Sequence, residues 1–157
     1  MIRFLRTDEV EKLLPLSAQV NALHEEEHPE QYRGDAAPEE VTEFFKQRLG
    51  EGAQVFVAEG PDGGLTGFLL AVPVVREASP FLHPARYVEL DQICVDKTCR
   101  GQGVGKALVA ALEAWMRDND FQQWKSMVHG FNMHSQHLMS RQGAEVLGLR
   151  YRKMLSD

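Results

Sequence analysis

Apolar and polar residues alternate along this chain with a period that changes from that of a helix to that of a strand and back. Residues 8–28 have the helical period, and Pro15 marks a kink near the start. The apolar positions of this segment trace roughly one face: Val10, Leu13, Leu14, Leu16, Val20 and Leu23. A second helix begins at Pro38, with acidic residues in its first turn, and ends at Gly50. The pattern therefore predicts two helices in the N-terminal third.

Segments around these helices show the shorter period of strands. Residues 2–6 predict a short first strand, and residues 54–59 and 65–75 predict two more. The latter two enclose Gly60-Pro61-Asp62-Gly63-Gly64, which is a hairpin signal. After a loop that contains proline, residues 87–95 predict the next strand of what reads as an antiparallel unit.

The C-terminal part alternates helices and strands. The pattern predicts a helix over residues 103–118, a strand over 123–129, a helix over 132–142 and a closing strand over 145–155. No repeat or linker interrupts this order. We therefore expect one α/β domain over residues 1–157, built on a mixed sheet.

Composition narrows the classes of function. The chain of 157 residues has 43% hydrophobic residues and a net charge of −6, which argues against a nucleic-acid-binding protein. Its two cysteines fit neither a disulfide framework nor a zinc pattern, and we expect no metal. No signal-peptide core and no apolar run of membrane-spanning length is present, so a cytoplasmic protein that does not enter the membrane is expected.

The most informative segment is the glycine-rich turn between the strand at 87–95 and the helix at 103–118. A strand, glycines and a helix start in succession aim backbone N–H groups at one small volume, where a phosphate group would bind. The segment is not a phosphate-binding loop of the Walker type, because Arg100 stands at the first glycine position and Ala107 follows Lys106. It does not match the dinucleotide fingerprint either, because its glycines are spaced two apart after antiparallel strands.

This segment resembles the signature of the GNAT superfamily of N-acetyltransferases. Arg100-Gly101-Gln102-Gly103-Val104-Gly105 fits the family pattern (Gln/Arg)-x-x-Gly-x-(Gly/Ala). The order of predicted elements matches the family over nearly the whole chain. Ile93-Cys94-Val95-Asp96 resembles the end of the family's fourth strand, and Asn132 resembles the Asn that starts its last helix.

The resemblance implies a GNAT-like, mostly antiparallel sheet flanked by helices, with central strands that splay apart to form an acyl-CoA cleft. It implies acetyl-CoA as co-substrate, with its pyrophosphate on the N–H groups of Gly101, Gln102, Gly103, Val104, Gly105 and Lys106. Arg100 and Lys106 would add charge, unless either is an ordinary surface residue. The pantetheine arm would pair with the backbone around Ile93, Cys94 and Val95. Asn132 would reach the same arm or cap its helix.

Acetyl transfer needs a base that deprotonates the amine. Strand alternation places Glu89, Asp91, Ile93 and Val95 on one face, and both acids stand where family members carry a catalytic carboxylate. Burial would raise the pKa of either acid. We favour Glu89 over Asp91, with surface or structural roles as the alternative. Cys94 would face away from Glu89, which makes a covalent route through its thiol the weaker hypothesis.

The chain departs from the family at the acid that protonates the leaving thiolate. Many members place a tyrosine where this chain has Met139, which cannot donate a proton. Either His134 or His137 serves instead, or the thiolate takes its proton from water. The two histidines share a helical face, and a role as ordinary polar residues is the alternative.

The acceptor cannot be named from the sequence. Residues 24–37, between the first two helices, are acidic and would attract a cationic amine, or are only a solvated helix end. Small molecules and protein or peptide amines both remain open, as does an acyl group longer than acetyl. A non-catalytic acyl-CoA-binding or regulatory domain is the alternative function, and an interaction domain with a vestigial site is a third. Homodimers are common among proteins that resemble this chain, although the sequence does not reveal its oligomeric state.

Overall fold

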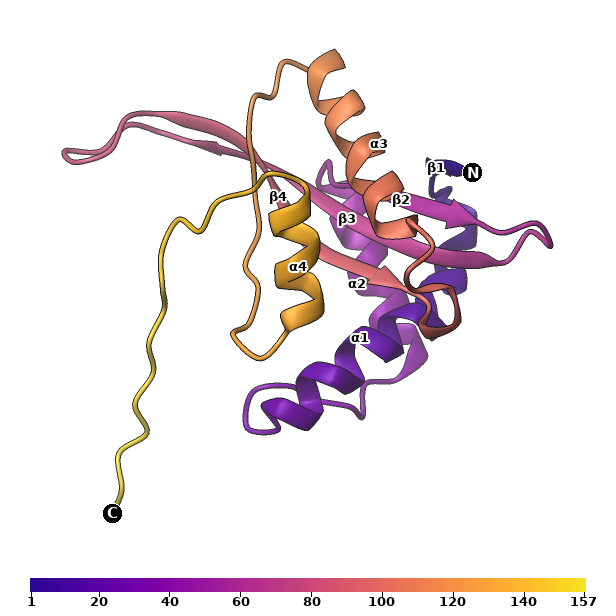
Figure 1. Cartoon of the computed structure of the whole chain (residues 1–157), viewed down its shortest axis with the longest axis horizontal. Coiled ribbons are helices and arrows are strands. Elements are labelled where there is room, and N and C mark those ends of the chain that lie inside the picture. Colours follow the sequence, from indigo (N-terminus) through magenta and orange to yellow (C-terminus); the bar gives the residue numbers. More distant parts are fainter. The chain divides into compact units, whose positions relative to one another are not determined.

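The computed structural model describes all residues from 1 to 157. The chain divides into two compact units, Met1–Met127 and Val128–Asp157, which we describe one at a time. The elements of the first unit follow in this order: β1 (Ile2–Phe4), the 3₁₀ helix η1 (Thr7–Leu13), α1 (Leu14–Glu27), α2 (Pro38–Gly50), β2 (Gln54–Glu59), β3 (Leu65–Arg76), β4 (Ala85–Val95), η2 (Lys97–Cys99), α3 (Val104–Asp118) and β5 (Trp124–Lys125) (Figure 1). The second unit contains α4 (Met133–Arg141).

One five-stranded sheet organises the first unit. Its strands lie in the order β1-β2-β3-β4-β5. The first three pairings are antiparallel, and only β4 and β5 run parallel. The structure thus confirms a mixed, mostly antiparallel sheet. The long pairing of β3 with β4 forms its centre and continues past the neighbouring strands as a two-stranded ribbon (Figure 1).

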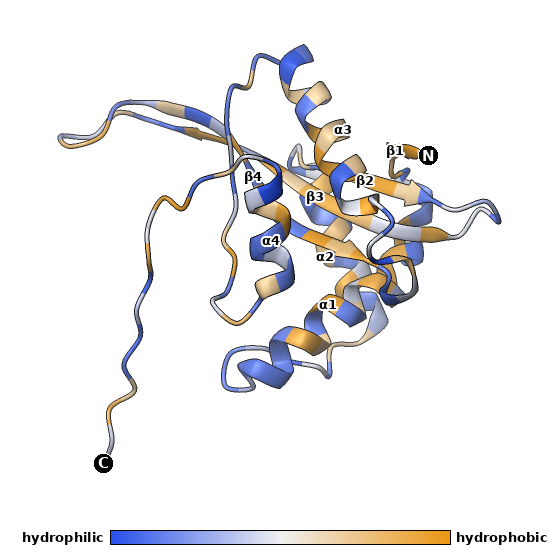
Figure 2. Ribbon diagram, viewed as in Figure 1, coloured by the Kyte–Doolittle hydropathy of each residue, from blue (hydrophilic) through white to orange (hydrophobic).

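Helices cover both faces of this sheet, because alternate residues of its strands are apolar on each side. On one face, Val57, Phe68 and Leu70 pack with Leu16 of α1 and Phe45 of α2. The Phe45 and Phe68 rings meet edge to face, with centroids 5.8 Å apart. On the other face lies α3, whose Trp115 contacts Phe56 of β2. Figure 2 shows the apolar residues concentrated along the central strands.

The first predicted helix forms in two parts. Residues Thr7–Leu13 are a 3₁₀ helix, and the α-helix runs from Leu14 to Glu27 with Pro15 in its first turn. Proline fits this turn because the N–H it lacks has no intrahelical acceptor there. No helix of the structure is long and apolar enough to cross a bilayer.

Two predicted strands differ from the structure. The strand expected at 123–129 is reduced to Trp124–Lys125. The closing strand expected at 145–155 is wrong, because residues 144–157 carry no helix or strand and are all exposed. Alternation of apolar residues becomes a strand only where a neighbouring strand accepts its backbone hydrogen bonds, and the period of the sequence does not reveal whether such a neighbour is paired.

Candidate active site

A β-bulge in β4 decides which side chains share a face. Leu70 pairs with Gln92, but the next residue of β3, Ala71, pairs with Leu90, so Asp91 is an extra residue on β4. Paired residues of an antiparallel ladder point to the same face, and one extra residue reverses the alternation. Side chains after Asp91 therefore point to the opposite face from the one that uninterrupted alternation would give them.

This corrects the prediction that Glu89, Asp91, Ile93 and Val95 share one face. Glu89 pairs with Val72, while Gln92 and Cys94 pair with Leu70 and Phe68 on that same face of β3. Ile93 and Val95 lie on the opposite face. Cys94 therefore lies on the side of Glu89 and not opposite it. Strand periodicity could not reveal this, because nothing in the local pattern marks Asp91 as the bulge.

Strands β4 and β5 part close to Glu89. They pair only at Val88 with Trp124 and at Glu89 with Lys125. The last contact is the Ser126 hydroxyl, which donates a hydrogen bond to the Leu90 carbonyl at 2.9 Å. Beyond it, residues 91–95 of β4 have β3 as a strand neighbour on one side only. The backbone edge of β4 on the other side is therefore available to another extended group.

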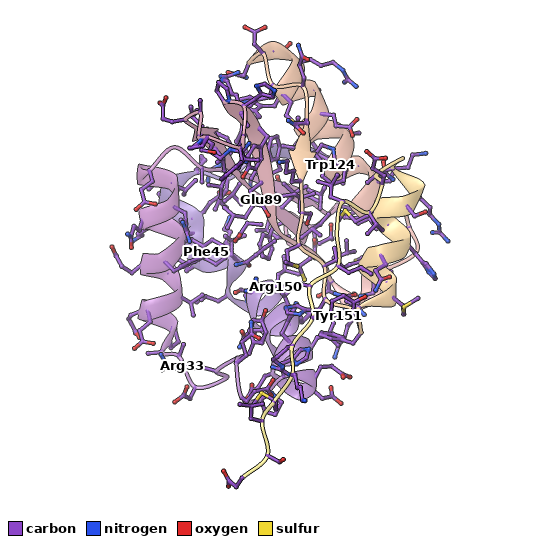
Figure 3. The ribbon with its side chains drawn as sticks, turned by 90° about the vertical axis from the view of Figure 1, so that its left-hand side faces the viewer. Arg33, Phe45, Glu89, Trp124, Arg150 and Tyr151 are labelled. Atoms are coloured by element: carbon purple, nitrogen blue, oxygen red, sulfur yellow. The ribbon has the colours of Figure 1, made fainter.

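Glu89 lies half-buried at the point where the strands part. Figure 3 shows it on β4 beside the strand that carries Trp124. Burial raises the pKa of the Glu89 carboxyl, the charge of Asp91 adds to that rise, and Lys125 opposes it. The Lys125 ammonium also lies 4.2 Å from the centre of the Tyr87 ring. A carboxyl whose pKa is raised is suited to accept a proton near neutral pH.

Asp91 differs from Glu89 in its surroundings. Its side chain is exposed. Its charge adds to the effect of burial in raising the pKa of the Tyr32 hydroxyl. Tyr32 comes from the segment between α1 and α2, where its ring contacts that of His24 at 4.9 Å. The acidic 24–37 segment thus brings an aromatic hydroxyl into the electrostatic range of Asp91, which sequence spacing could not predict.

The glycine-rich turn is open to solvent. Gly101 and Gly103 have φ values of +77° and +83°, in the left-handed region that favours glycine. A Cβ at either position would meet no atom within 4 Å, so the space beside the turn is empty. Gly103 is the N-cap of α3 and provides no side chain to satisfy the first N–H groups of the helix. The turn therefore presents free donors at a helix N-terminus.

A polar cluster joins α1 to the segment around η2, directly before the glycine-rich turn. Asp96 accepts hydrogen bonds from the Thr98 N–H at 2.8 Å and from the Gln19 side chain at 2.9 Å. The Gln19 carbonyl oxygen in turn accepts from the Lys97 N–H at 3.1 Å. Bonds from Thr98 and then Gln19 lower the pKa of Asp96 to about 2. Gln19 was missed by sequence reasoning, since it lies far from the turn in the chain.

A glycine within β3 lets α3 come close to the sheet. A Cβ on Gly67 of β3 would come within 2.8 Å of the Cys94 carbonyl oxygen and 3.1 Å of Val104. Val104 is the first residue of α3, directly after the glycine-rich turn. Only glycine at position 67 lets the start of α3 approach the sheet this closely. Its isolated place within a strand pattern is the signal that could have identified it.

Cys94 is buried and faces α1. Its thiol donates a hydrogen bond to the Leu16 carbonyl at 3.3 Å. Burial raises the pKa of this thiol to about 11. The reactive thiolate is therefore scarce at neutral pH, which is typical of a structural cysteine.

In the second unit, Asn132 caps α4. Its side-chain oxygen accepts a hydrogen bond from the Ser135 N–H at 3.0 Å. Met139, where many family members carry tyrosine, is buried, whereas His134 and His137 are exposed. At about 100° per helical residue, neither histidine shares the face of Met139. The structure therefore does not bring either histidine into the position of the missing tyrosine.

The model of the acetyltransferase (GNAT) family matches residues 19–144. Aminoglycoside N(6')-acetyltransferase type 1 of Klebsiella aerogenes is 35% identical over 78 residues, and the match spans 50% of this chain and 50% of that relative.

Solved structures share the fold at lower identity. A variant of the BH1408 protein of Bacillus halodurans aligns with a TM-score of 0.88 at 19% identity over 99% of each chain. An aminoglycoside antibiotic 6'-N-acetyltransferase of Acinetobacter haemolyticus aligns with a TM-score of 0.73 at 18% identity, over 100% of this chain and 99% of that one. At these identities the likeness concerns the fold alone.

Proposed function

Because this chain belongs to the acetyltransferase (GNAT) family, we propose that it transfers an acetyl group from acetyl-CoA to a primary amine by direct attack in a ternary complex. One observation carries the proposal: an open glycine turn at the start of α3 follows a strand whose free edge begins beside a half-buried carboxyl, Glu89. A cytoplasmic location stays a prediction.

The residues present fit an acyl-CoA. Free N–H groups at a helix N-terminus attract phosphate, and the empty space beside Gly101 and Gly103 admits it. We assign the pyrophosphate to residues 101–106 and the added charge to Arg100 and Lys106. The pantetheine amides would continue the ladder along the free edge of β4 around Ile93, Cys94 and Val95. Asn132 has its side chain engaged as a helix cap, and a further role toward the same arm stays a prediction.

Glu89 acts as the base in this proposal. An acceptor ammonium gives its proton to the carboxylate, directly or through one water, and the neutral nitrogen then attacks the thioester carbonyl. A nitrogen–carbon bond forms, the nitrogen gives its second proton to water, the carbon–sulfur bond breaks, and the thiolate leaves and takes a proton from water. Asp91 contributes its charge, which raises the pKa of Glu89.

The acceptor we propose is a small polycationic amine. The chain has a net charge of −6, and acids occur in the 24–37 segment as well as at Glu89 and Asp91. The relative of Klebsiella aerogenes is, by name, an aminoglycoside N(6')-acetyltransferase, which supports an amino sugar as the first acceptor to test. A protein or peptide amine is the other acceptor class.

A non-catalytic acyl-CoA-binding or regulatory domain is the second candidate function. Met139 favours it, because methionine cannot replace the tyrosine acid of many family members. Both functions predict that the protein binds acetyl-CoA and CoA. Only the acetyltransferase predicts that an amine acceptor releases the CoA thiol.

Thermal unfolding with separate additions of acetyl-CoA, CoA, ATP and NAD tests the binding step. A ligand at a hundredfold its Kd stabilises the fold by about 2.7 kcal/mol. We expect a rise of several degrees with the two CoA compounds alone. Thiol release with an aminoglycoside or a polyamine then separates the candidates. A thermal shift without release from any amine or peptide supports the binding domain, and no shift with either CoA compound contradicts both functions.

A further inference from the structure

Strand β5 brings one cationic side chain to the face of the sheet that carries Glu89. The register pairs Lys125 with Glu89 and Trp124 with Val88. Successive residues of a strand point to opposite faces, so Lys125 lies on the side of Glu89 and Trp124 on the other. Trp124 lies toward α3, where its indole N–H donates a hydrogen bond to Glu113 at 3.1 Å. This bond fixes the face to which Lys125 points.

The Lys125 ammonium is held over an aromatic ring. Its nitrogen lies 4.2 Å from the centre of the Tyr87 ring, a distance at which the face of the ring attracts a cation. Tyr87 stands two residues before Glu89 on β4, so the two side chains share a face. All three side chains are half-buried. In this arrangement Lys125 makes no ion pair with the Glu89 carboxylate.

Lys125 is the counter-charge of the base. The titratable groups near Glu89 come from three parts of the first unit: Tyr87 and Asp91 of β4, Lys125 of β5, and Tyr32 of the segment between α1 and α2, which acts through Asp91. Its pairing residue on β3, Val72, carries no charge. Burial first and the charge of Asp91 second raise the pKa of the Glu89 carboxyl, and Lys125 lowers it. Lys125 therefore favours the ionised form of Glu89.

A direct ion pair would make a poorer base. A carboxylate that is hydrogen-bonded to an ammonium has a much lowered pKa, and its oxygens are occupied. A carboxylate that is half-buried beside a second acid, with no cation nearby, tends instead to stay protonated. An ammonium held a short distance away avoids both results, because its field acts on the carboxylate while its N–H groups do not bind it.

We propose that Tyr87 and Lys125 are positioning residues for the base: the ring holds the Lys125 ammonium near Glu89 but off its carboxylate, so that Glu89 is ionised and its oxygens can take a proton from the acceptor. The role in catalysis rests on the proposed acetyl transfer, whereas the arrangement of charges can be tested without turnover. Lys125 keeps its own proton throughout, and neither residue contacts the reacting atoms.

The first test is a titration of the Glu89 carboxyl by ¹³C NMR, on the full chain with glutamate labelled at Cδ. Glu89→Gln identifies the signal by its loss. In K125M the midpoint should move to higher pH, because the counter-charge is gone. In Y87L it should move to lower pH, because the released ammonium then pairs with the carboxylate. K125R keeps the charge and Y87F keeps the ring, so both should retain the wild-type midpoint.

K46M is the matched control for the loss of one positive charge. Lys46 is exposed on α2 and is not among the charges that act on Glu89, so the midpoint should stay in place. Circular dichroism checks that each variant is folded, and Y87M, which fills space without a ring, replaces Y87L if that variant does not fold. A midpoint in K125M that stays or falls overturns the role of Lys125. A midpoint in Y87L that stays or rises overturns the role of Tyr87.

The second test relates the midpoint to turnover, with an aminoglycoside as the acceptor. K125M should lower kcat/KM by about two- to tenfold on the acidic side of the pH profile and retain the plateau. An acidic limb that does not follow the NMR midpoint overturns the role in catalysis. Midpoints that move as expected, in a protein that releases no thiol with any amine, would support the arrangement of charges and contradict acetyl transfer. Midpoints that stay in place, in a protein that turns over, would overturn this inference and leave acetyl transfer standing.

Discussion

At the scale of single residues, the site depends on two neighbouring acids that the fold separates by environment. Glu89 is half-buried, and its pKa is raised first by that burial, whereas Asp91 is exposed on the bulge. A base must be unprotonated to act, so the proposed rate rises with pH through the pKa of Glu89. The raised pKa therefore places the acidic limb of the pH profile above the range of an ordinary glutamate.

Glu89→Gln and Asp91→Asn should consequently behave differently. Glu89→Gln removes the base and should lower kcat by about 10²–10⁴-fold. Asp91→Asn keeps the base but removes a negative neighbour, so the acidic limb should move to lower pH while the plateau is retained. Profiles of kcat/KM from about pH 5 to about pH 9 measure the position of the acidic limb and the height of the plateau for each variant. Equal losses in the two variants would contradict the assignment of Glu89.

Cys94 gives a second prediction at this scale. Its pKa of about 11 and its bond to the Leu16 carbonyl indicate a structural thiol. Cys94→Ala should leave the rate of acetyl transfer nearly unchanged and cost about 1 kcal/mol of stability. The half-exposed Cys99 should react with iodoacetamide first in the wild type. Loss of turnover in a folded Cys94→Ala variant would support a covalent route through the Cys94 thiol.

At the scale of elements, the position of α3 controls the glycine-rich turn. Gly67→Ala would push a methyl group against the Cys94 carbonyl and Val104, so the start of α3 must shift. We expect a loss of about 1–3 kcal/mol in stability and a higher Kd for acetyl-CoA. Gly50→Ala, where a Cβ meets no atom within 4 Å, is the matched control and should lower neither the stability nor the affinity. Urea unfolding and calorimetric titration measure the two effects.

The Asp96 cluster joins the segment directly before this turn to α1 and should be sensitive to acid. The pKa of Asp96 is lowered to about 2 from a model-peptide value of 3.8. Because the pKa of this carboxyl is lower in the folded than in the unfolded state, its ionised form stabilises the fold at any pH above the unfolded pKa. This contribution is lost as the pH falls from about 4 to about 2. Asp96→Ala should therefore unfold at lower urea than the wild type at pH 7, and the difference should shrink at pH 3. A difference that does not depend on pH would mean that the carboxylate charge is unimportant.

At the scale of the whole molecule, the net charge of −6 bears on the choice of acceptor. A negative protein draws cations from solution, and salt screens this attraction because the Debye length falls from about 10 Å at 0.1 M to about 3 Å at 1 M. The KM of a polycationic amine should therefore rise with salt, and that of an acceptor with a single charge should rise less. Initial rates at two salt concentrations test this. A KM that is independent of salt for both amines would argue against electrostatic selection of the acceptor.

Much of this architecture was accessible from the sequence. The strands at 54–59 and 65–75, the helix that follows the glycine-rich turn and the family signature itself depend on local rules. These rules concern the period of apolar residues, the turns and helix ends that glycine and proline mark, and the N–H donors at a helix N-terminus. Such features need no knowledge of what lies across the fold.

The bulge at Asp91 and the parting of β4 from β5 were decided only by tertiary structure. Each depends on which residue of one strand meets which residue of another, and pairing across a sheet is not encoded in the period of either strand. For the same reason the sequence placed Glu89 with Ile93 and Val95, and the fold placed it with Gln92 and Cys94. The sequence thus determined the chemistry available to this protein, and the register of its strands determined which of those groups face one another.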